Sequence, residues 1–217
     1  MHNNSLKMAS HTNADTVIVL DFETTGLSPA YGDRAIEIGA VKLVNGELVE
    51  RFQQLMYPGR RIDYFIESYT GITNDMLKSA PRCEEVMSEF SEFIQDFNLV
   101  AHNASFDSRF LESEFERIDC NDHGPFACSM LTARRVYPDA PNHKLGTLVH
   151  YKSLPNDGTF HRALADAEMT AHLWLGMLDD IKLHHTFDMI EFNLMQKLSR
   201  VSKTAVSSFL KKQSDKL

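Results

Sequence analysis

The sequence predicts a mixed α/β domain in which three antiparallel strands come first and helices alternate with strands afterwards. Three observations predict this order: an apolar β-branched segment near the start, a hairpin signal after it, and helical spacing of aromatic residues beyond residue 85. The 217 residues suffice for one compact domain that buries its own core without disulfides or structural metals.

The first segment, 16–22 (TVIVLDF), is short, apolar and β-branched, which is typical of a buried central strand. Residues 35–44 and 48–56 are also strand-like. They are joined at Asn45-Gly46, and both of these residues tolerate the positive φ that a tight hairpin turn requires. The sequence therefore predicts a strand followed by a hairpin.

The pattern then becomes helical. Phenylalanines and a valine recur at spacings of four, three and four residues, which gives one apolar helix face: Val86, Phe90, Phe93 and Phe97. Further along the chain we expect a short strand at 99–102 and helices at about 106–118, 129–136 and 162–183.

The two ends differ from this body. Residues 1–15 are polar and predict a disordered tail, 16–183 form the main domain, and 184–217 form a helical, basic extension. From residue 193 onward six lysines and arginines face one aspartate, so the charge is +6 − 1 = +5. The extension is either a solvated helix packed on the domain or a surface for a partner or a nucleic-acid backbone.

Charge and composition restrict the function. The net charge of −8 disfavours a long nucleic-acid track but allows an enzyme that grips a few terminal nucleotides, where cations supply positive charge. Three scattered cysteines predict reduced thiols. Without a signal peptide or an apolar run of about 18 residues, we expect a cytoplasmic protein with no membrane partner.

Two carboxylates stand at the end of the first strand. Alternation places Asp21 and Glu23 on one face, with Phe22 on the other. Such a pair on a buried strand repels and loses hydration unless a cation lies between, and hard oxygen ligands favour Mg²⁺ or Mn²⁺. The alternative is a strand end at which two acids cap a loop.

Two further segments carry candidate groups. Asp107 follows His102 in the segment HNASFD and lies in a first helical turn, where the helix dipole alone favours an acid. Asp166 follows His161 in HRALAD, between alanines on a helix face expected to pack inward. Either histidine could equally be an ordinary polar residue, His102 at a strand end and His161 on an exposed loop.

Together, these segments resemble the three motifs of the DEDDh exonucleases of the DnaQ-like superfamily. The first is 21–27 (DFETTGL), the second 102–107, and the third 161–166, which has the family form HxAxxD. The resemblance extends over about residues 16–178. It implies a ribonuclease H-like fold with a central mixed five-stranded sheet flanked by helices, and a metal-dependent 3′→5′ exonuclease.

The resemblance also implies roles for residues. Asp21, Glu23 and Asp166 would hold one of two divalent cations, Mg²⁺ or Mn²⁺; Asp21 would bridge to the second, with Asp107 assisting. His161 would be the general base for the attacking water. The expected substrate-binding residues are Phe22, Thr24, Thr25, Gly26, Leu27, His102, Asn103 and Phe106.

Within this group, Thr24-Thr25-Gly26 and the GIT segment at 71–73 are similar to the epsilon-type proofreading members, although Thr70 stands where these usually have histidine. This implies release of nucleoside 5′-monophosphates from single-stranded DNA or frayed 3′ ends, in replication or repair, with a DNA polymerase as candidate partner. One alternative is an RNA exonuclease of the same family. The other is a non-catalytic, polymerase-associated binding module.

Overall fold

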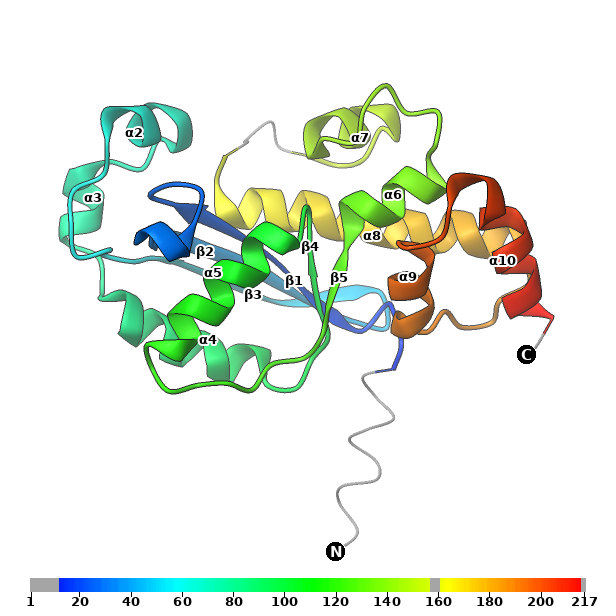
Figure 1. Ribbon diagram of the computed structural model, residues 1–217, viewed down its shortest axis with the longest axis horizontal. Coiled ribbons are helices and arrows are strands. Elements are labelled where there is room, and N and C mark those ends of the chain that lie inside the picture. Colours follow the sequence, from blue (N-terminus) through cyan, green and yellow to red (C-terminus); the bar gives the residue numbers. More distant parts are fainter. Residues whose placement is uncertain (1–11, 157–160, 216–217) are drawn as a thin grey trace, which may run out of the picture.

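A central five-stranded sheet organises the molecule, and the computed structural model describes residues 12–156 and 161–215 (Figure 1). The strand order is β3-β2-β1-β4-β5. The strands are β1 (Val17–Thr24), β2 (Ala35–Val44), β3 (Glu47–Leu55), β4 (Leu99–Ala101) and β5 (Phe126–Cys128).

The first three strands are antiparallel and the last two run parallel to β1. The β2–β3 turn uses Asn45 and Gly46 with φ of 52° and 80°, as the hairpin signal predicts. The predictions that three antiparallel strands come first and that the sheet is mixed and five-stranded are confirmed. In the β1–β2 register, Asp21 pairs with Gly39 and Glu23 with Glu37, which places two acids opposite each other at one end of the sheet.

Helices cover both faces of the sheet, and β1 contributes to two cores through its alternation. Ile18 and Leu20 pack with the face that α4 (Cys83–Ile94) and α5 (Ser105–Glu116) cover. Val17 and Val19 pack on the opposite face, with the long helix α8 (Ala163–His184). By the same alternation, Asp21 and Glu23 belong to the α8 face.

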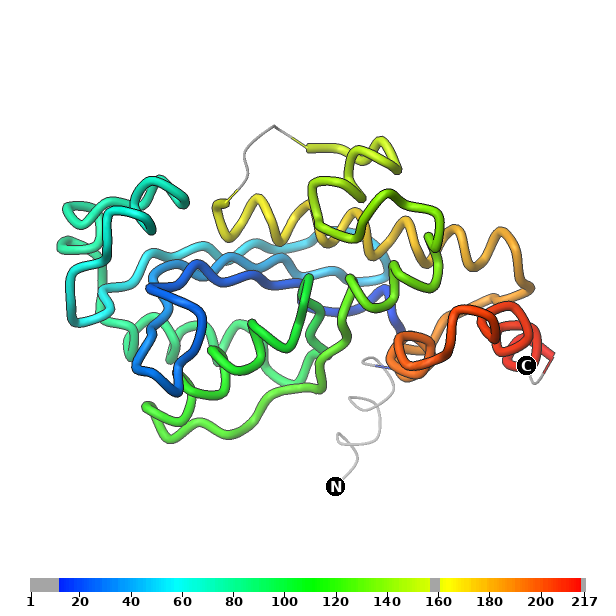
Figure 2. Tube along the Cα trace, turned by 45° about the horizontal axis from the view of Figure 1, so that its top comes forward, coloured from blue at the N-terminus to red at the C-terminus, as the bar shows by residue number. Residues whose placement is uncertain are grey.

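Shorter helices complete the fold. The structure confirms α6 (Ser129–Val136), whereas α2 (Tyr64–Thr70), α3 (Asn74–Lys78) and α7 (Leu145–Tyr151) have no counterpart in the predicted elements. Both views place α2 beside the start of α8 (Figures 1 and 2). Among the described residues, no helix combines the length and the apolar character that crossing a membrane requires.

Part of the predicted terminal tail is ordered. Residues 1–11 of it lie outside the described residues, but residues 12–15 are fixed in place. Ala14 is fully buried, its N–H bonds the carbonyl of Ile190 at 2.8 Å, and its carbonyl accepts from the Trp174 indole at 2.6 Å. The tail prediction is therefore wrong for these four residues, because they pair with a segment far along the chain.

The C-terminal segment packs on the domain. It contains α9 (Phe192–Leu198), a 3₁₀ turn (Lys203–Ala205) and α10 (Val206–Ser214), at the far end of α8 from α2 (Figure 2). Met195, Leu198 and Leu210 are buried in the same core as Trp174. Of the two predictions for the extension, the packed helix describes its apolar side. Its described basic residues are exposed: Lys197, Arg200, Lys203, Lys211 and Lys212.

Candidate active site

Three carboxylates meet at the end of β1. Asp21 and Glu23 project from the strand, and Asp166 comes from the first turn of α8, which begins over β2. One oxygen from each of the three lies within 4.8 Å of the others. The structure therefore brings together two of the three predicted motifs in one acidic cluster, which we define as Asp21, Glu23 and Asp166.

Asp107, from the second motif, lies beside this cluster in the layer of α5, on the opposite face of the sheet from α8. It is 1% exposed, in the first turn of α5, and its carboxylate accepts a hydrogen bond of 3.2 Å from the peptide N–H of Phe22. Its charge contributes to the raised pKa values of Asp21 and Glu23. It does not line the open cavity described below.

The four carboxylates share an unfavourable environment. Burial raises the pKa of Asp21 well above its usual range, and the charges of Asp107 and Asp166 raise it further. Burial, aided by Asp166 and Glu37, raises the pKa of Glu23 to about 8. Burial likewise raises the pKa of Asp107 to about 7 and that of Asp166 to about 6, although hydrogen bonds from peptide N–H groups oppose both shifts.

No ion pair in the described part of the chain joins a lysine or arginine to these four groups. Buried acids that repel one another and lack a cationic partner mark a functional site. Carboxylate oxygens at this spacing fit a hard divalent cation such as Mg²⁺ or Mn²⁺, which would replace the missing positive charge. The residues present thus fit the cofactor that the motifs imply.

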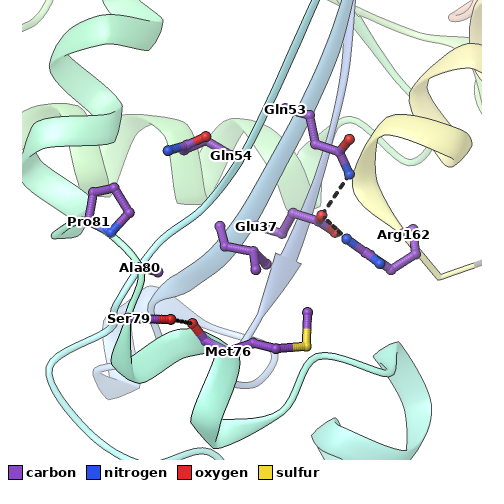
Figure 3. A pocket seen from close by; sticks show the side chains of 9 residues that line it. Glu37, Gln53, Gln54, Met76, Ser79, Ala80, Pro81 and Arg162 are labelled. Carbon is purple, nitrogen blue, oxygen red and sulfur yellow. Dashed lines mark hydrogen bonds and ion pairs between the residues drawn. The ribbon is translucent and has the colours of Figure 1, made fainter.

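The first turn of α8 is anchored to the sheet from behind the cluster. Arg162, the residue before α8, forms a forked ion pair with the buried carboxylate of Glu37 on β2, at 2.7 and 3.1 Å (Figure 3). Gln53 donates to the same carboxylate from β3. A cavity of about 400 Å³ adjoins Glu37 and Arg162, and no residue of the acidic cluster lines it.

A larger cavity of about 740 Å³ opens beside the acidic cluster. Its walls come from the end of β1 and the loop after it, from α2, and from the starts of α5 and α8. The lining residues are Asp21, Phe22, Glu23, Thr24, Thr25, Gly26, Leu27, Asp63, Phe65, Ile66, Tyr69, Thr70, Phe106, His161 and Asp166. Six of the eight predicted substrate-binding residues lie in this wall.

His161 stands at the mouth of the cavity. Its backbone has φ of 62°, and its peptide N–H donates a hydrogen bond of 3.1 Å to Oδ2 of Asp166. The imidazole ring packs against the Tyr69 ring, with centroids 4.1 Å apart. Because the backbone makes the contact with Asp166, the ring itself remains free to face a substrate or a water.

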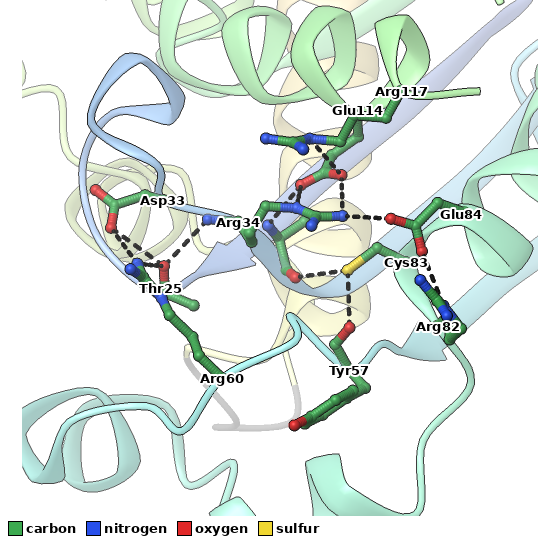
Figure 4. Close-up of polar contacts among 11 residues, drawn as sticks. Thr25, Asp33, Arg34, Tyr57, Arg60, Arg82, Cys83, Glu84, Glu114 and Arg117 are labelled. Atoms are coloured by element: carbon green, nitrogen blue, oxygen red, sulfur yellow. Dashed lines mark hydrogen bonds and ion pairs between the residues drawn. The ribbon is translucent and has the colours of Figure 1, made fainter. Parts of the chain in front are cut away.

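The loop after β1 is braced by hydrogen bonds. The Thr25 hydroxyl donates to Asp33 and accepts from the Arg34 N–H and the Arg60 guanidinium (Figure 4). The Thr24 hydroxyl donates to the Gly26 carbonyl at 2.6 Å. Both hydroxyls therefore have partners within the protein. The loop presents its backbone and the 79% exposed side chain of Leu27 to the cavity.

Arg34 holds the base of this loop. Its guanidinium pairs with the buried carboxylate of Glu114 at 2.7 and 2.8 Å and with Glu84 at 3.2 Å (Figure 4). A Cβ atom at Gly26 would overlap the carboxylate of Asp33, so this position in the loop admits no side chain without rearrangement. The loop is thus a fixed wall of the cavity.

Two predicted substrate-binding residues lie elsewhere. The ring nitrogens of His102 contact the Ser129 hydroxyl and the His143 carbonyl, both at 2.9 Å, and burial lowers its pKa to about 4. Asn103 is exposed, with φ of 72°, in the turn between β4 and α5. Neither residue lines the cavity, because the His102 ring turns toward α6 rather than toward Asp107.

The aromatic wall that α2 contributes is not among the predicted site residues. The rings of Phe65 and Tyr69 are nearly parallel, with centroids 5.9 Å apart, and the residues are 71% and 52% exposed. Their i, i+4 spacing was visible, since 64–70 holds three aromatic residues among seven. The helix has only seven residues, too few for a periodic apolar face, so the sequence pattern does not predict that it lines the cavity.

Comparisons with known proteins agree with this geometry. A model of the exonuclease family (RNase_T) matches residues 18–174. The PolC-type DNA polymerase III of Halalkalibacterium halodurans is 42% identical over 164 residues, which cover 75% of this chain and 11% of that protein. The chain spans about an eighth of the length of the curated relatives it matches.

Solved structures share the ribonuclease H-like fold. Exonuclease X in complex with 5′ overhanging duplex DNA is 26% identical with a TM-score of 0.63, covering 84% of this chain and 99% of that one. The nuclease domain of 3′hExo, a DEDDh family member bound to rAMP, is 22% identical with a TM-score of 0.65, covering 82% and 96%.

Proposed function

Since the chain belongs to the DnaQ-like exonuclease family, we propose that it hydrolyses the terminal phosphodiester bond of single-stranded DNA or frayed 3′ ends and releases nucleoside 5′-monophosphates. The observation that carries the proposal is the acidic cluster, whose oxygens lie within 4.8 Å of one another at the wall of an open cavity. A terminal nucleotide entering this cavity would bring its phosphate to the cluster.

Asp21, Glu23 and Asp166 are the proposed ligands of a first cation, and Asp21 with Asp107 of a second. Two divalent cations bound there would neutralise the scissile phosphate and activate a water. The protein's own contribution is to hold the ligands. Asp21 and Glu23 are fixed by β1, Asp107 by its bond to the Phe22 N–H, and Asp166 by its bond from the His161 N–H.

His161 is the proposed general base. Its ring lies at the mouth of the cavity, next to Asp166, and is not used in holding that carboxylate. It can accept a proton from the attacking water on the solvent side of the acidic cluster. A positioned base of this kind typically contributes about 10²–10⁴-fold to the rate.

The substrate would be gripped by apolar side chains around the acids. Phe65 and Tyr69 on one wall and Leu27 on the other are exposed and border the cavity. Aromatic rings stack on any base, so this wall suits single strands of any sequence. A cavity that no described lysine or arginine lines also agrees with a protein of net charge −8 that holds only the last nucleotides.

We propose DNA as the substrate and a DNA polymerase as the partner, because the curated relatives are PolC-type DNA polymerases. RNA is the second candidate, favoured by the neighbour of the same fold that is bound to rAMP. A purely binding role is disfavoured, because all four carboxylates are present and three of them converge.

The test uses the purified chain and matched single strands of DNA and RNA, each labelled at the 5′ end. With Mg²⁺ or Mn²⁺ we expect a ladder that shortens from the 3′ end, faster on DNA, and none with EDTA. Faster shortening of RNA would shift the assignment to the second candidate. Internal cuts, or a ladder that persists in EDTA, would contradict the proposed mechanism.

A further inference from the structure

Glu37 is a fifth carboxylate near the site, and the proposed chemistry does not use it. It is fully buried on β2, directly opposite Glu23 in the β1–β2 register. Unlike the four proposed metal ligands, it is saturated with donors. Arg162 donates through Nε at 3.1 Å and Nη2 at 2.7 Å, the Ala163 N–H donates at 3.1 Å, and Gln53 donates at 2.9 Å.

These bonds attach the start of α8 to the sheet. Ala163 is the first residue of α8, so Glu37 satisfies one of the helix's unpaired N–H groups and places a negative charge at the positive end of its dipole. Asp166 follows within the same turn, its N–H bonded to the Arg162 carbonyl at 3.0 Å. Asp166 therefore lies three positions after Ala163, whose N–H is bonded to Glu37.

A second contact also holds the start of α8 against β2. A Cβ atom at Gly39 would overlap the backbone of Ala163 and Leu164, so strand and helix touch through their main chains there. Gly39 pairs with Asp21 across the sheet. The two strand ligands and the helix ligand are thus connected through β2, and Glu37 is the side chain that fixes the angle at which α8 starts.

Glu37 and Arg162 also balance each other's charge. The charge of Glu37 raises the pKa values of Asp21, Glu23 and Asp166, whereas that of Arg162 lowers the pKa of Glu23. Paired, the two orient the helix with little net charge. Separated, Arg162 would place an unpaired cation beside the acidic cluster, where it would compete with a divalent ion.

We propose that Glu37 and Arg162 act as a positioning pair that sets the affinity of the acidic cluster for divalent cations. The inference rests on the proposed function, since it concerns the same metal ligands. Residues that orient metal ligands from behind typically account for about 10–100-fold in metal affinity or activity. The pair touches neither substrate nor reacting atoms, and it acts through Asp166 and His161.

The test measures Mn²⁺ binding to the folded protein without nucleic acid, by the paramagnetic resonance signal of free Mn²⁺. In Glu37→Gln the new side-chain NH₂ group would point at groups that are themselves donors. The guanidinium of Arg162 would lose its carboxylate partner. We expect about 10-fold weaker Mn²⁺ binding. Arg162→Lys keeps the positive charge but cannot form the forked pair with Glu37. Because the Arg162 side chain is 33% exposed, this variant should disturb folding least.

Two controls separate positioning from stability. Glu50→Gln removes the Lys42–Glu50 pair on the same strands, where Glu50 is 55% exposed, and should leave Mn²⁺ binding unchanged. Glu114→Gln breaks another buried forked pair, with Arg34, and should lower the melting temperature without weakening Mn²⁺ binding. If Glu37 had only a structural role, Glu37→Gln would behave like Glu114→Gln: its melting temperature would fall and its Mn²⁺ binding would stay unchanged.

The outcomes are distinguishable. If the wild type does not bind Mn²⁺, the proposed function fails. If the wild type binds and both Glu37→Gln and Arg162→Lys bind equally well, within about twofold, the positioning role alone is overturned. In the double variant Glu37→Gln/Arg162→Lys we expect a loss smaller than the sum of the two single losses, because both members act through one contact.

Discussion

The peptide N–H of Phe22 donates a 3.2 Å hydrogen bond to the Asp107 carboxylate and so joins the central strand to the first turn of α5, across 85 residues of sequence. Asp107 therefore serves the structure and, in our proposal, the metal site. Asp107→Asn separates the two roles, because the amide oxygen can still accept from Phe22 while the charge is lost.

We expect Asp107→Asn to lose at least about 100-fold in metal-dependent nucleotide release. Its free energy of unfolding in EDTA should be unchanged or higher, since one repelling carboxylate is gone. Asp107→Ala also removes the acceptor and should cost about 1–3 kcal/mol of stability. Urea unfolding beside the activity assay checks this, and full activity in Asp107→Asn would remove Asp107 from the metal site.

His161→Ala should lose about 10²–10⁴-fold in the rate of hydrolysis and keep its Mn²⁺ affinity. The reason is geometric: the bond to Asp166 comes from the peptide N–H, which the substitution retains. Single-turnover rates at saturating metal measure the effect. His150→Ala, an exposed histidine on α7 away from the cavity, is the control, and an equal rate in both variants would contradict the assignment of the base.

The metal-free protein should lose stability as pH rises. The folded-state pKa values of Asp166, Asp107 and Glu23 are raised to about 6, 7 and 8, above the ordinary values of about 4 in the unfolded chain. Between about pH 4 and 8 the folded state then holds more protons, and the free energy of unfolding decreases with pH. The loss across this window should be at least about 1 kcal/mol.

Divalent cations should reverse this trend, because they bind the ionised carboxylates and displace the protons. Urea unfolding at pH 5, 7 and 8.5, with EDTA or with Mn²⁺, checks both directions. We expect the stabilisation by Mn²⁺ to grow with pH. If the free energy of unfolding in EDTA instead rose across this window, the pKa values of the buried acids would not be raised in the folded state.

The aromatic wall of α2 should control substrate affinity. Phe65→Ala should raise KM for a single strand by about 5–150-fold, in line with about 1–3 kcal/mol per stacked base. Tyr69→Ala should also lower kcat, because it removes the ring against which His161 packs. Tyr64→Ala is the matched control, since Tyr64 lies on the same helix, is 82% exposed and does not line the cavity.

Deletion of the basic C-terminal extension should destabilise the whole fold. Met195, Leu198 and Leu210 are buried with Trp174, so deleting the residues after Phe192 should prevent stable folding. Leu198→Ala should cost about 2–5 kcal/mol, measured by urea unfolding. Lys211→Ala, at an exposed position of α10, should change stability by less than about 0.5 kcal/mol.

Alternation and motif order predicted much of this site. Strand periodicity placed Asp21 and Glu23 on one face, and the structure adds Asp166 to that face through α8. The predicted helix at 129–136 agrees with α6 residue for residue. These features depend on local patterns that repeat along the chain, and such patterns are visible before any tertiary contact is known.

Features set by distant contacts were not predictable. β5 has three residues and α2 has seven, too few to show a period. The orientation of His102 depends on Ser129 and on the His143 carbonyl, 27 and 41 residues away. Glu37 looked like an ordinary strand residue, because its partner Arg162 lies 125 residues further along the chain.

The main-chain contact at Gly39 limits how this enzyme can be altered. Any side chain introduced there would act as a wedge and tilt α8 away from the strands, moving one acid relative to the other two. Random libraries that seek new substrates should therefore recover glycine at this position among active clones, while tolerating variety at Leu27 and Phe65 on the rim. Side chains at the rim of the cavity can therefore vary, whereas the main-chain contact between β2 and α8 behind the acidic cluster cannot.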